Sequence, residues 1–185
     1  MKTEKTPMEG LVVLIPDVFC DDRGYFFESY QTERYRQAGI HAHFVQDNES
    51  SSVRGVIRGL HFQRPPHAQA KLVRVIRGTV LDVAVDCRPY SATFGQWYGV
   101  ALSEENKKQF FIPAGFAHGF SVLSEKATFA YKCDAYYHPD AEDGILVDDP
   151  FLNIDWQIPF SEAIISEKDQ KNKLFQEMNF NFNRQ

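Results

Sequence analysis

The feature that most constrains the fold is a series of short segments, rich in β-branched and aromatic residues, that glycine and proline separate. They recur at close spacing in the middle of the chain, and Gly78 stands between two of them at a natural hairpin position. Strands repeated at this spacing predict a β-sandwich or a β-barrel. The expected strands cover residues 11–15, 25–30, 55–63, 71–77, 79–86, 96–102, 109–112, 119–123 and 127–136, with residues 44–52 leading into the third.

Helical signals are few and short. Residues 32–38 form the best early helix, with Thr32 as a possible N-cap and Gly39 after its end. Residues 166–169 form a polar segment that could be helical, and the tail after Phe175 is expected to be irregular or packed at an edge. No linker or repeat divides the chain, so we predict one mainly β domain over residues 1–185 with a few short helices.

Composition narrows the class of protein. A net charge of −5 argues against a general nucleic-acid binder. No apolar run approaches the roughly 20 residues of a membrane helix, and residues 1–7 lack the apolar core of a signal peptide. Cys20, Cys87 and Cys133 are odd in number and far apart, which indicates free thiols in a reducing compartment. We expect a cytoplasmic protein with no nucleic-acid or membrane partner.

The segment from Val56 to Lys71 concentrates candidate active-site chemistry. Arg58 suits a phosphate, His61 is a base near neutral pH, and Lys71 suits an oxyanion. Strict alternation along a strand would point Arg58 and His61 to opposite faces, but Gly59 between them can carry a bulge that brings both to one face. A buried lysine beside a histidine is costly unless it is used or paired. The pattern therefore favours a carbon-acid active site inside a β-barrel.

A second histidine follows in Pro113-Ala-Gly-Phe-Ala-His118, which resembles the second motif of cupin-type barrels. In that motif the glycine permits a tight turn and the histidine points inward. Metal-binding cupins carry His-x-His and a glutamate in their first motif, whereas this chain reads His61-Phe-Gln63. His67, in the Pro-Pro bend, could substitute as a ligand. Because a catalytic metal needs about three protein ligands, the sequence favours a cupin-like barrel without metal.

Two further residues suit proton transfer. Tyr131 lies in an expected strand and could act as a general acid, since a phenol can protonate a carbanion in a water-poor site. Asp169 lies in the late polar segment. If this segment folds back against His61, the carboxylate would orient the imidazole and stabilise its protonated form.

Polar residues near turns provide possible ligand contacts. Arg23, in an Asp-Asp-Arg-Gly turn, could pair with a phosphate. Gln46 and Asn48 could bond a base or a sugar. Tyr136 and Tyr137 could supply a stacking face for a base. Turn formation and packing are the ordinary uses of all these residues.

Several motifs follow one another in a defined order. They are Phe-x-Asp-Asp-Arg-Gly-x-Phe (19–26), Gln-Asp-Asn (46–48), Arg-Gly-Leu-His-Phe-Gln (58–63), Gln-x-Lys-Leu-Val (69–73), Asp-Val-Ala-Val-Asp (82–86), Phe-Gly-Gln-Trp (94–97), Ile-Pro-x-Gly-Phe-Ala-His-Gly-Phe (112–120) and Tyr-Lys (131–132). Each motif alone is weak, but the ordered set, over roughly residues 10–170, closely resembles the dTDP-4-dehydrorhamnose 3,5-epimerase family.

The resemblance implies a jelly-roll, cupin-like barrel that works as a homodimer without metal or cofactor. The implied reaction converts dTDP-4-dehydro-6-deoxy-D-glucose to dTDP-4-dehydro-L-rhamnose, in dTDP-L-rhamnose biosynthesis. By resemblance, His61 is the base for the C5 and C3 protons, and Asp169 completes a His–Asp dyad. Lys71 stabilises the enolate oxygen, and Tyr131 delivers a proton from the opposite face.

The resemblance also assigns contacts with the nucleotide-sugar. The matching positions are Arg23, Glu28, Gln46, Asn48, Arg58, His118, Glu142 and Lys168, and Tyr137 joins the predicted substrate contacts as the stacking residue. In the family, the region of Arg23 and Glu28 reaches the partner subunit's site. An N-terminal arm, about residues 1–50, is therefore expected to contribute to the dimer, and residues 150–185 are expected to pack on the barrel.

The chain departs from the family pattern in its C-terminal part, and other functions stay open. Val147 stands before two aspartates where relatives often carry Trp and Asn, and Trp156-Gln-Ile-Pro159 replaces the usual Trp-Pro. These changes bear on the loop that carries Lys168 and Asp169. The alternatives are a mono-epimerase, a nucleotide-sugar ketoisomerase, a metal-dependent cupin, and a non-catalytic sugar-binding barrel.

Overall fold

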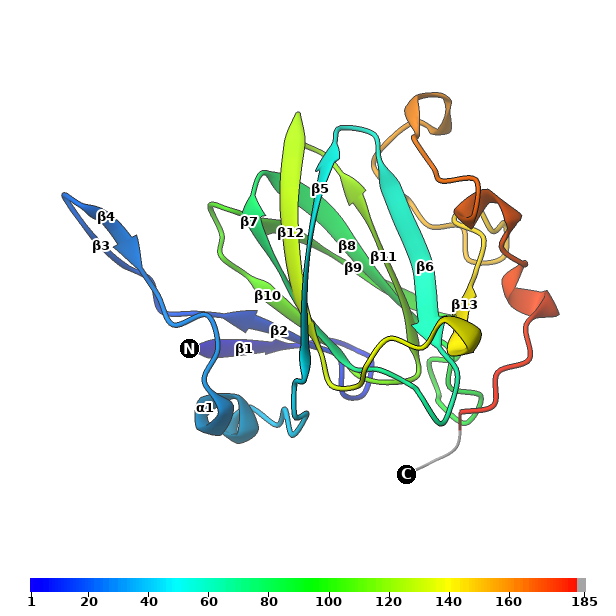
Figure 1. Cartoon of the computed structure of the whole chain (residues 1–185), viewed down its shortest axis with the longest axis horizontal. Coiled ribbons are helices and arrows are strands. Elements are labelled where there is room, and N and C mark those ends of the chain that lie inside the picture. The colour runs from blue at the N-terminus through cyan, green and yellow to red at the C-terminus, as the bar shows by residue number, and fades with distance from the viewer. Residues whose placement is uncertain (183–185) are drawn as a thin grey trace.

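Two antiparallel β-sheets face each other in the computed structural model, which describes residues 1–182 (Figure 1). The six-stranded sheet has the order β1 (Lys2–Lys5), β2 (Val12–Ile15), β10 (Gln109–Ile112), β7 (Lys71–Arg77), β12 (Lys126–Cys133), β5 (Gln46–Val53). The five-stranded sheet has the order β13 (Glu142–Gly144), β6 (Ile57–Gln63), β11 (Phe116–Val122), β8 (Thr79–Asp86), β9 (Trp97–Ser103).

Consecutive strands pass repeatedly from one sheet to the other. From β5 to β8 the chain alternates between the sheets at every step, and it does so again from β9 to β12. This crossing order is that of a jelly roll. The predicted mainly β, cupin-like fold with few short helices is confirmed, although the two sheets stay separate and do not close into a continuous barrel.

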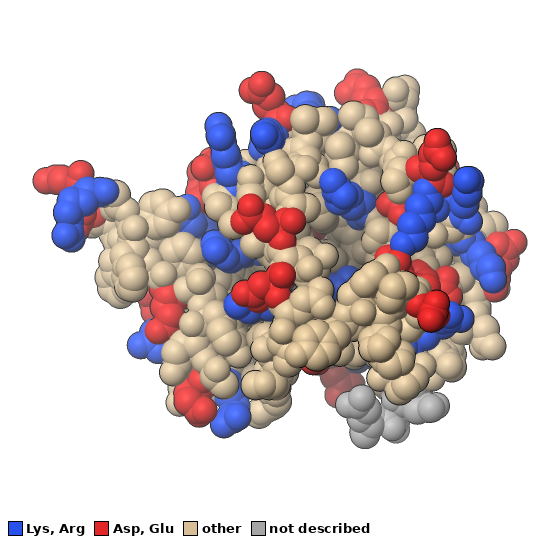
Figure 2. Space-filling model, in the orientation of Figure 1, with Lys and Arg blue, Asp and Glu red and all other residues tan. Residues whose placement is uncertain are grey.

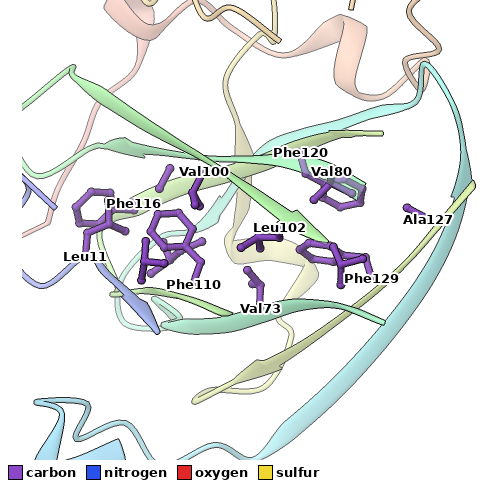
Figure 3. Packing of buried hydrophobic residues seen from close by; sticks show 14 of the residues in the cluster. Leu11, Val73, Val80, Val100, Leu102, Phe110, Phe116, Phe120, Ala127 and Phe129 are labelled. Carbon is purple, nitrogen blue, oxygen red and sulfur yellow. The ribbon is translucent and has the colours of Figure 1, made fainter. Parts of the chain in front are cut away.

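The core fills the space between the sheets. Alternation along β7 points Val73 and Val75 inward, and the same alternation along β8 points Val80 and Ala84 toward them. Figure 3 shows Phe110 and Phe129 among these aliphatic side chains. Because aromatic and β-branched residues pack at crystal-like density, this core is a rigid support for the strands around it.

A second cluster covers the outer face of the five-stranded sheet. Leu81 and Val85 of β8 point outward, where they meet the C-terminal segment. The largest side chain there is Trp156, which is 1% exposed and donates its indole N–H to the carbonyl of Val147 at 2.7 Å. Because both faces of β8 are covered, its sequence reads as an almost continuous apolar run.

The remaining elements are short. They are the hairpin of β3 (Phe19–Asp21) and β4 (Gly24–Phe26), helix α1 (Thr32–Gln37), and four 3₁₀ helices, η1 (Pro139–Ala141), η2 (Phe160–Glu162), η3 (Asp169–Lys171) and η4 (Phe175–Glu177). None of the helices formed by the described residues has the length and hydrophobicity needed to cross a bilayer.

Some local predictions were wrong. The expected strand over residues 25–30 ends at Phe26, because only three residues pair across the hairpin. The N-cap of α1 is Gln31 rather than Thr32, and the Gln31 side chain accepts a hydrogen bond from the amide of Arg34 at 2.6 Å. Residues 46–53 form a full strand of their own, and β11 begins three residues earlier than predicted, at Phe116.

Candidate active site

A pocket of about 530 Å³ opens between the two sheets, bordered by β5, β6 and β12. Figure 2 shows this face of the molecule hollowed, with both basic and acidic side chains around the hollow. The predicted site residues that line it are Asn48, Arg58, His61, Lys71, His118, Tyr131, Lys168 and Asp169. Side chains from both sheets and from the C-terminal segment therefore converge on one volume.

A bulge in β6 brings two of these groups to the same face. Gly59 and Leu60 together oppose the single residue Gly119 of β11. Gly59 has a φ of +138°, and a Cβ there would lie 2.6 Å from the Cα of Gly119. Only glycine fits this close approach. The prediction that a bulge at Gly59 points both Arg58 and His61 into one pocket is confirmed.

His61 forms a close pair with Asp169. Its Nε2 lies 2.7 Å from the Asp169 Oδ1, and the aspartate is 4% exposed. Burial opposes ionisation of this carboxyl, but the hydrogen bond and charge of His61 outweigh it and hold the pKa of Asp169 below its usual value. A carboxylate only accepts hydrogen bonds, so in the neutral form of the ring Nε2 is the donor and Nδ1 has the lone pair. His61 is thus set up as a base.

Lys71 brings a cation into the pocket from β7. Burial lowers the pKa of its ammonium, and nearby negative charge, from Asp82 and Glu142 among others, acts in the opposite direction. A cation in a poorly solvated pocket interacts strongly with any oxygen that gains negative charge beside it. Lys71 is therefore suited to stabilise an enolate oxygen.

Tyr131 enters the same pocket from the opposite sheet to His61, because β12 and β6 belong to different sheets. Burial raises the pKa of the Tyr131 phenol. The hydroxyl is therefore protonated at neutral pH and able to donate. The arrangement places a base and an acid on two sides of one volume.

A smaller, polar pocket adjoins the first and also contains His61, Lys71 and Tyr131. Gln46 donates to the Oδ1 of Asn48 at 3.0 Å and accepts from the amide of Tyr137 at 3.0 Å. The Tyr137 hydroxyl donates to Glu142 at 2.7 Å, and Glu142 also forms an ion pair with Lys168. These predicted binding residues form one connected polar rim.

Two predicted binding residues do not reach either pocket of this chain. Arg23 lies at the tip of the β3–β4 hairpin, which extends away from the sandwich in Figure 1, and it pairs with Asp21. Glu28 follows the hairpin and pairs with Arg34 at 3.3 Å. The hairpin also exposes large aromatic side chains, with Phe26 71% accessible.

Sequence reasoning missed one residue behind the pocket. Asp82, on β8, is fully buried and lies 3.0–3.1 Å from the Nε2 of His118. The available signal was an aspartate at an inward position of an otherwise apolar strand. His67, considered above as a metal ligand, instead stacks on His138 with ring centroids 3.7 Å apart. Among residues 1–182, no group of three or more His, Cys, Asp or Glu side chains is arranged to hold a metal ion.

The fold and the pocket together define a class of protein. A His–Asp pair, an ammonium and a phenol surround one pocket of a jelly roll, and they are suited to moving protons at a carbon next to a carbonyl. The dTDP-4-dehydrorhamnose 3,5-epimerase family model matches residues 5–177.

Individual relatives agree with the family match. The chain is 52% identical to a dTDP-4-dehydrorhamnose 3,5-epimerase of Methanothermobacter thermautotrophicus, over 94% of each chain. The crystal structure of such an enzyme from Elizabethkingia anophelis superposes with a TM-score of 0.93 at 51% identity, covering 97% of this chain and 99% of that one.

A Legionella pneumophila 3,5-epimerase, solved in complex with dTDP-4-keto-L-rhamnose, gives a TM-score of 0.92 at 50% identity, over 96% of this chain and 94% of its own. The chain belongs to the dTDP-4-dehydrorhamnose 3,5-epimerase family of isomerases.

Proposed function

We propose that the chain converts dTDP-4-dehydro-6-deoxy-D-glucose to dTDP-4-dehydro-L-rhamnose by inverting C3 and C5, a step of dTDP-L-rhamnose biosynthesis. One observation carries the proposal. His61 and Tyr131 enter one pocket from opposite sheets, with Lys71 beside them. Inversion at a carbon needs a base on one face and an acid on the other, and this pocket provides both.

The first half of the reaction is proton removal. The Nδ1 of His61 takes the proton from C5, and the electrons of the C–H bond move to the C4 oxygen to give an enolate. Because a proton next to a ketone is weakly acidic, this oxygen must be stabilised as its charge develops, and the Lys71 ammonium does so. Asp169 stabilises the imidazolium that forms.

The second half returns a proton from the opposite face. The Tyr131 hydroxyl protonates C5, the C4 ketone re-forms, and solvent returns the phenol and imidazolium to their starting states. The same groups then act at C3, which is also next to the C4 carbonyl. No redox change occurs, since each cycle removes one proton and restores one.

The polar rim is proposed to hold the nucleotide. Arg58 and Lys168 supply positive charge for the pyrophosphate, where guanidinium and ammonium groups are effective. Tyr137 is 51% exposed at the rim and offers its ring to the thymine base. The other proposed contacts of the nucleotide-sugar in this chain are Gln46, Asn48, His118 and Glu142.

Arg23 and Glu28 are proposed to act in a homodimer, where the hairpin arm reaches the partner's site. The support is the exposed aromatic surface of the arm, where Phe19 is 66% and Tyr25 57% accessible. Contiguous exposed apolar patches of this kind mark association surfaces. Sedimentation velocity should give a dimer, and Phe26→Asp should shift it toward monomer. A monomeric wild-type protein would contradict this part of the proposal.

A cytoplasmic location is proposed on the basis of the thiols. Cys20, Cys87 and Cys133 are all free, and two of them are buried. Unpaired cysteines are typical of reducing compartments.

The deciding experiment is incubation of the purified protein with dTDP-4-dehydro-6-deoxy-D-glucose in D₂O, followed at C3 and C5 by NMR. We expect deuterium at both carbons. Label at one carbon only would mean a mono-epimerase. No label on a substrate that nevertheless binds would mean another sugar substrate or a binding protein.

A further inference from the structure

Asp82 is a carboxylate inside the apolar core, and the mechanism above gives it no role. Alternation along β8 turns it inward between Val80 and Ala84, and its exposed fraction is zero. Within the described residues its side chain hydrogen-bonds to His118 alone, with both oxygens 3.0–3.1 Å from Nε2. A charged group in this position requires a physical explanation.

The cost of this burial is substantial. Moving a carboxylate out of water is strongly unfavourable unless partners compensate, and apolar residues in such places are often neutral or stabilising. Burial raises the pKa of Asp82, while the charges of His118 and Lys71 and the His118 hydrogen bond act against this. The compensation thus comes from two residues that line the pocket.

The contact with His118 fixes the chemistry of that imidazole. Burial lowers the pKa of His118, which favours the neutral ring at neutral pH. A neutral imidazole has one donor and one acceptor nitrogen, and here Nε2 donates to Asp82. Nδ1 is left as the acceptor, which suits a sugar hydroxyl.

The charges around Lys71 single out Asp82 as its counter-charge. The titratable and charged groups that surround it or share its pockets are Glu49, Arg58, His61, Asp82, His118, Tyr131, Cys133, Tyr137, Glu142, Lys168 and Asp169.

The other negative groups are excluded on separate grounds. Glu142 pairs with Lys168, Glu49 is exposed to solvent, and Asp169 bonds to His61 and is not among the charges that raise the pKa of Lys71. Burial raises the pKa of the Cys133 thiol to about 11, so it is uncharged. Of the two carboxylates whose charge raises the pKa of Lys71, Glu142 is paired with Lys168, whereas Asp82 has no lysine or arginine in direct contact within the described residues.

We propose that Asp82 is a positioning residue of the active site. Its buried carboxylate holds His118 with Nδ1 as a hydrogen-bond acceptor for the sugar and supplies the negative charge that keeps Lys71 protonated. Asp82 touches no substrate in this scheme and acts through these two groups. The inference rests on the proposed function for its consequence on turnover, but the state of Lys71 and His118 can be tested without any substrate.

The test substitutes Asp82→Asn, which keeps the size of the side chain and an oxygen that accepts from His118, but removes the charge. An adjacent opposite charge shifts a pKa by about 1–3 units, and Asp82 contacts His118 rather than Lys71 itself. We expect the pH midpoint for Lys71 deprotonation to fall by about one unit, at the lower end of that range. Competitive labelling with acetic anhydride across pH, read at Lys71 by mass spectrometry against the exposed Lys126, measures it directly.

The kinetic consequence has a defined sign. Because the reaction needs the Lys71 ammonium, the alkaline limb of kcat should move to lower pH by the same amount in Asp82→Asn. Substitution of the exposed Asp155, Asp155→Asn, is the matched control and should change neither the Lys71 labelling curve nor the pH profile of kcat. A folded Asp82→Asn protein with an unchanged Lys71 labelling curve would overturn the proposal that Asp82 is the counter-charge of Lys71. Loss of the labelling shift is distinct from failure of the proposed function, which would leave every variant inactive on this sugar.

A measurement on the unmodified protein covers the case in which Asp82→Asn does not fold. Two-dimensional ¹⁵N NMR of the histidine rings distinguishes the two neutral tautomers. We expect a protonated Nε2 and an unprotonated Nδ1 at His118. A protonated Nδ1 would overturn the assigned role of Asp82.

Discussion

The His61–Asp169 pair allows a quantitative prediction. Asp169→Asn keeps a hydrogen-bond acceptor for His61 but removes the charge that stabilises the imidazolium. Hydrogen bonds to charged groups contribute about 1.5–3 kcal/mol, equivalent to roughly 10- to 150-fold in rate. The His61 side chain is 30% exposed, so solvent screens part of the effect. We expect kcat to fall about 10- to 50-fold.

The assay is exchange of the C5 proton in D₂O under saturating substrate, which isolates the step that His61 performs. Circular dichroism and thermal unfolding of the same preparations confirm that the variant is folded. Asp155→Asn lies in the same C-terminal segment but on the surface, and should exchange at the wild-type rate. A folded Asp169→Asn protein with wild-type exchange would refute the reasoning, since the 2.7 Å contact would then have no catalytic consequence.

Other substitutions test the remaining parts of the site and its scaffold. His61→Ala or Lys71→Ala should abolish detectable turnover while leaving the unfolding temperature close to wild type, since a general base alone is worth about 100- to 10,000-fold; near-wild-type activity in either variant would contradict the assignment. Gly59→Ala should lower the free energy of unfolding by more than about 3 kcal/mol, because a Cβ at that φ also meets the Gly119 backbone at 2.6 Å. Gly39→Ala has a positive φ but no neighbour within 4 Å, so chemical denaturation should show a loss of only about 1–2 kcal/mol.

The strand pattern could be predicted where one or both faces are apolar. β7 and β8 follow from their β-branched residues and from Gly78 between them. β5 was not predicted as a strand in its own right, because its sequence, Gln46–Val53, is almost entirely polar. It lies at the edge of its sheet and is held by pairing with β12, which is a tertiary contact that local sequence does not encode.

The site, too, could be predicted only where local sequence carries the signal. The bulge at Gly59 could be predicted because only a break in alternation brings Arg58 and His61 together. The contact between His61 and Asp169 spans 108 residues, so the residues alone offered it only as a condition on the folding of a distant segment, and the family resemblance assigned it. Asp82 was missed because a single carboxylate in an apolar strand gives no local clue to which pocket residue it serves.

The position of Asp169 has a consequence for protein synthesis. Every strand of both sheets in the described residues is encoded before residue 145, so His61, Lys71 and Tyr131 are all synthesised before residue 169. The partner that orients His61 arrives last, on a 3₁₀ helix. A nascent or prematurely terminated chain therefore lacks an oriented base, and the appearance of proton exchange during synthesis reports the docking of its final segment.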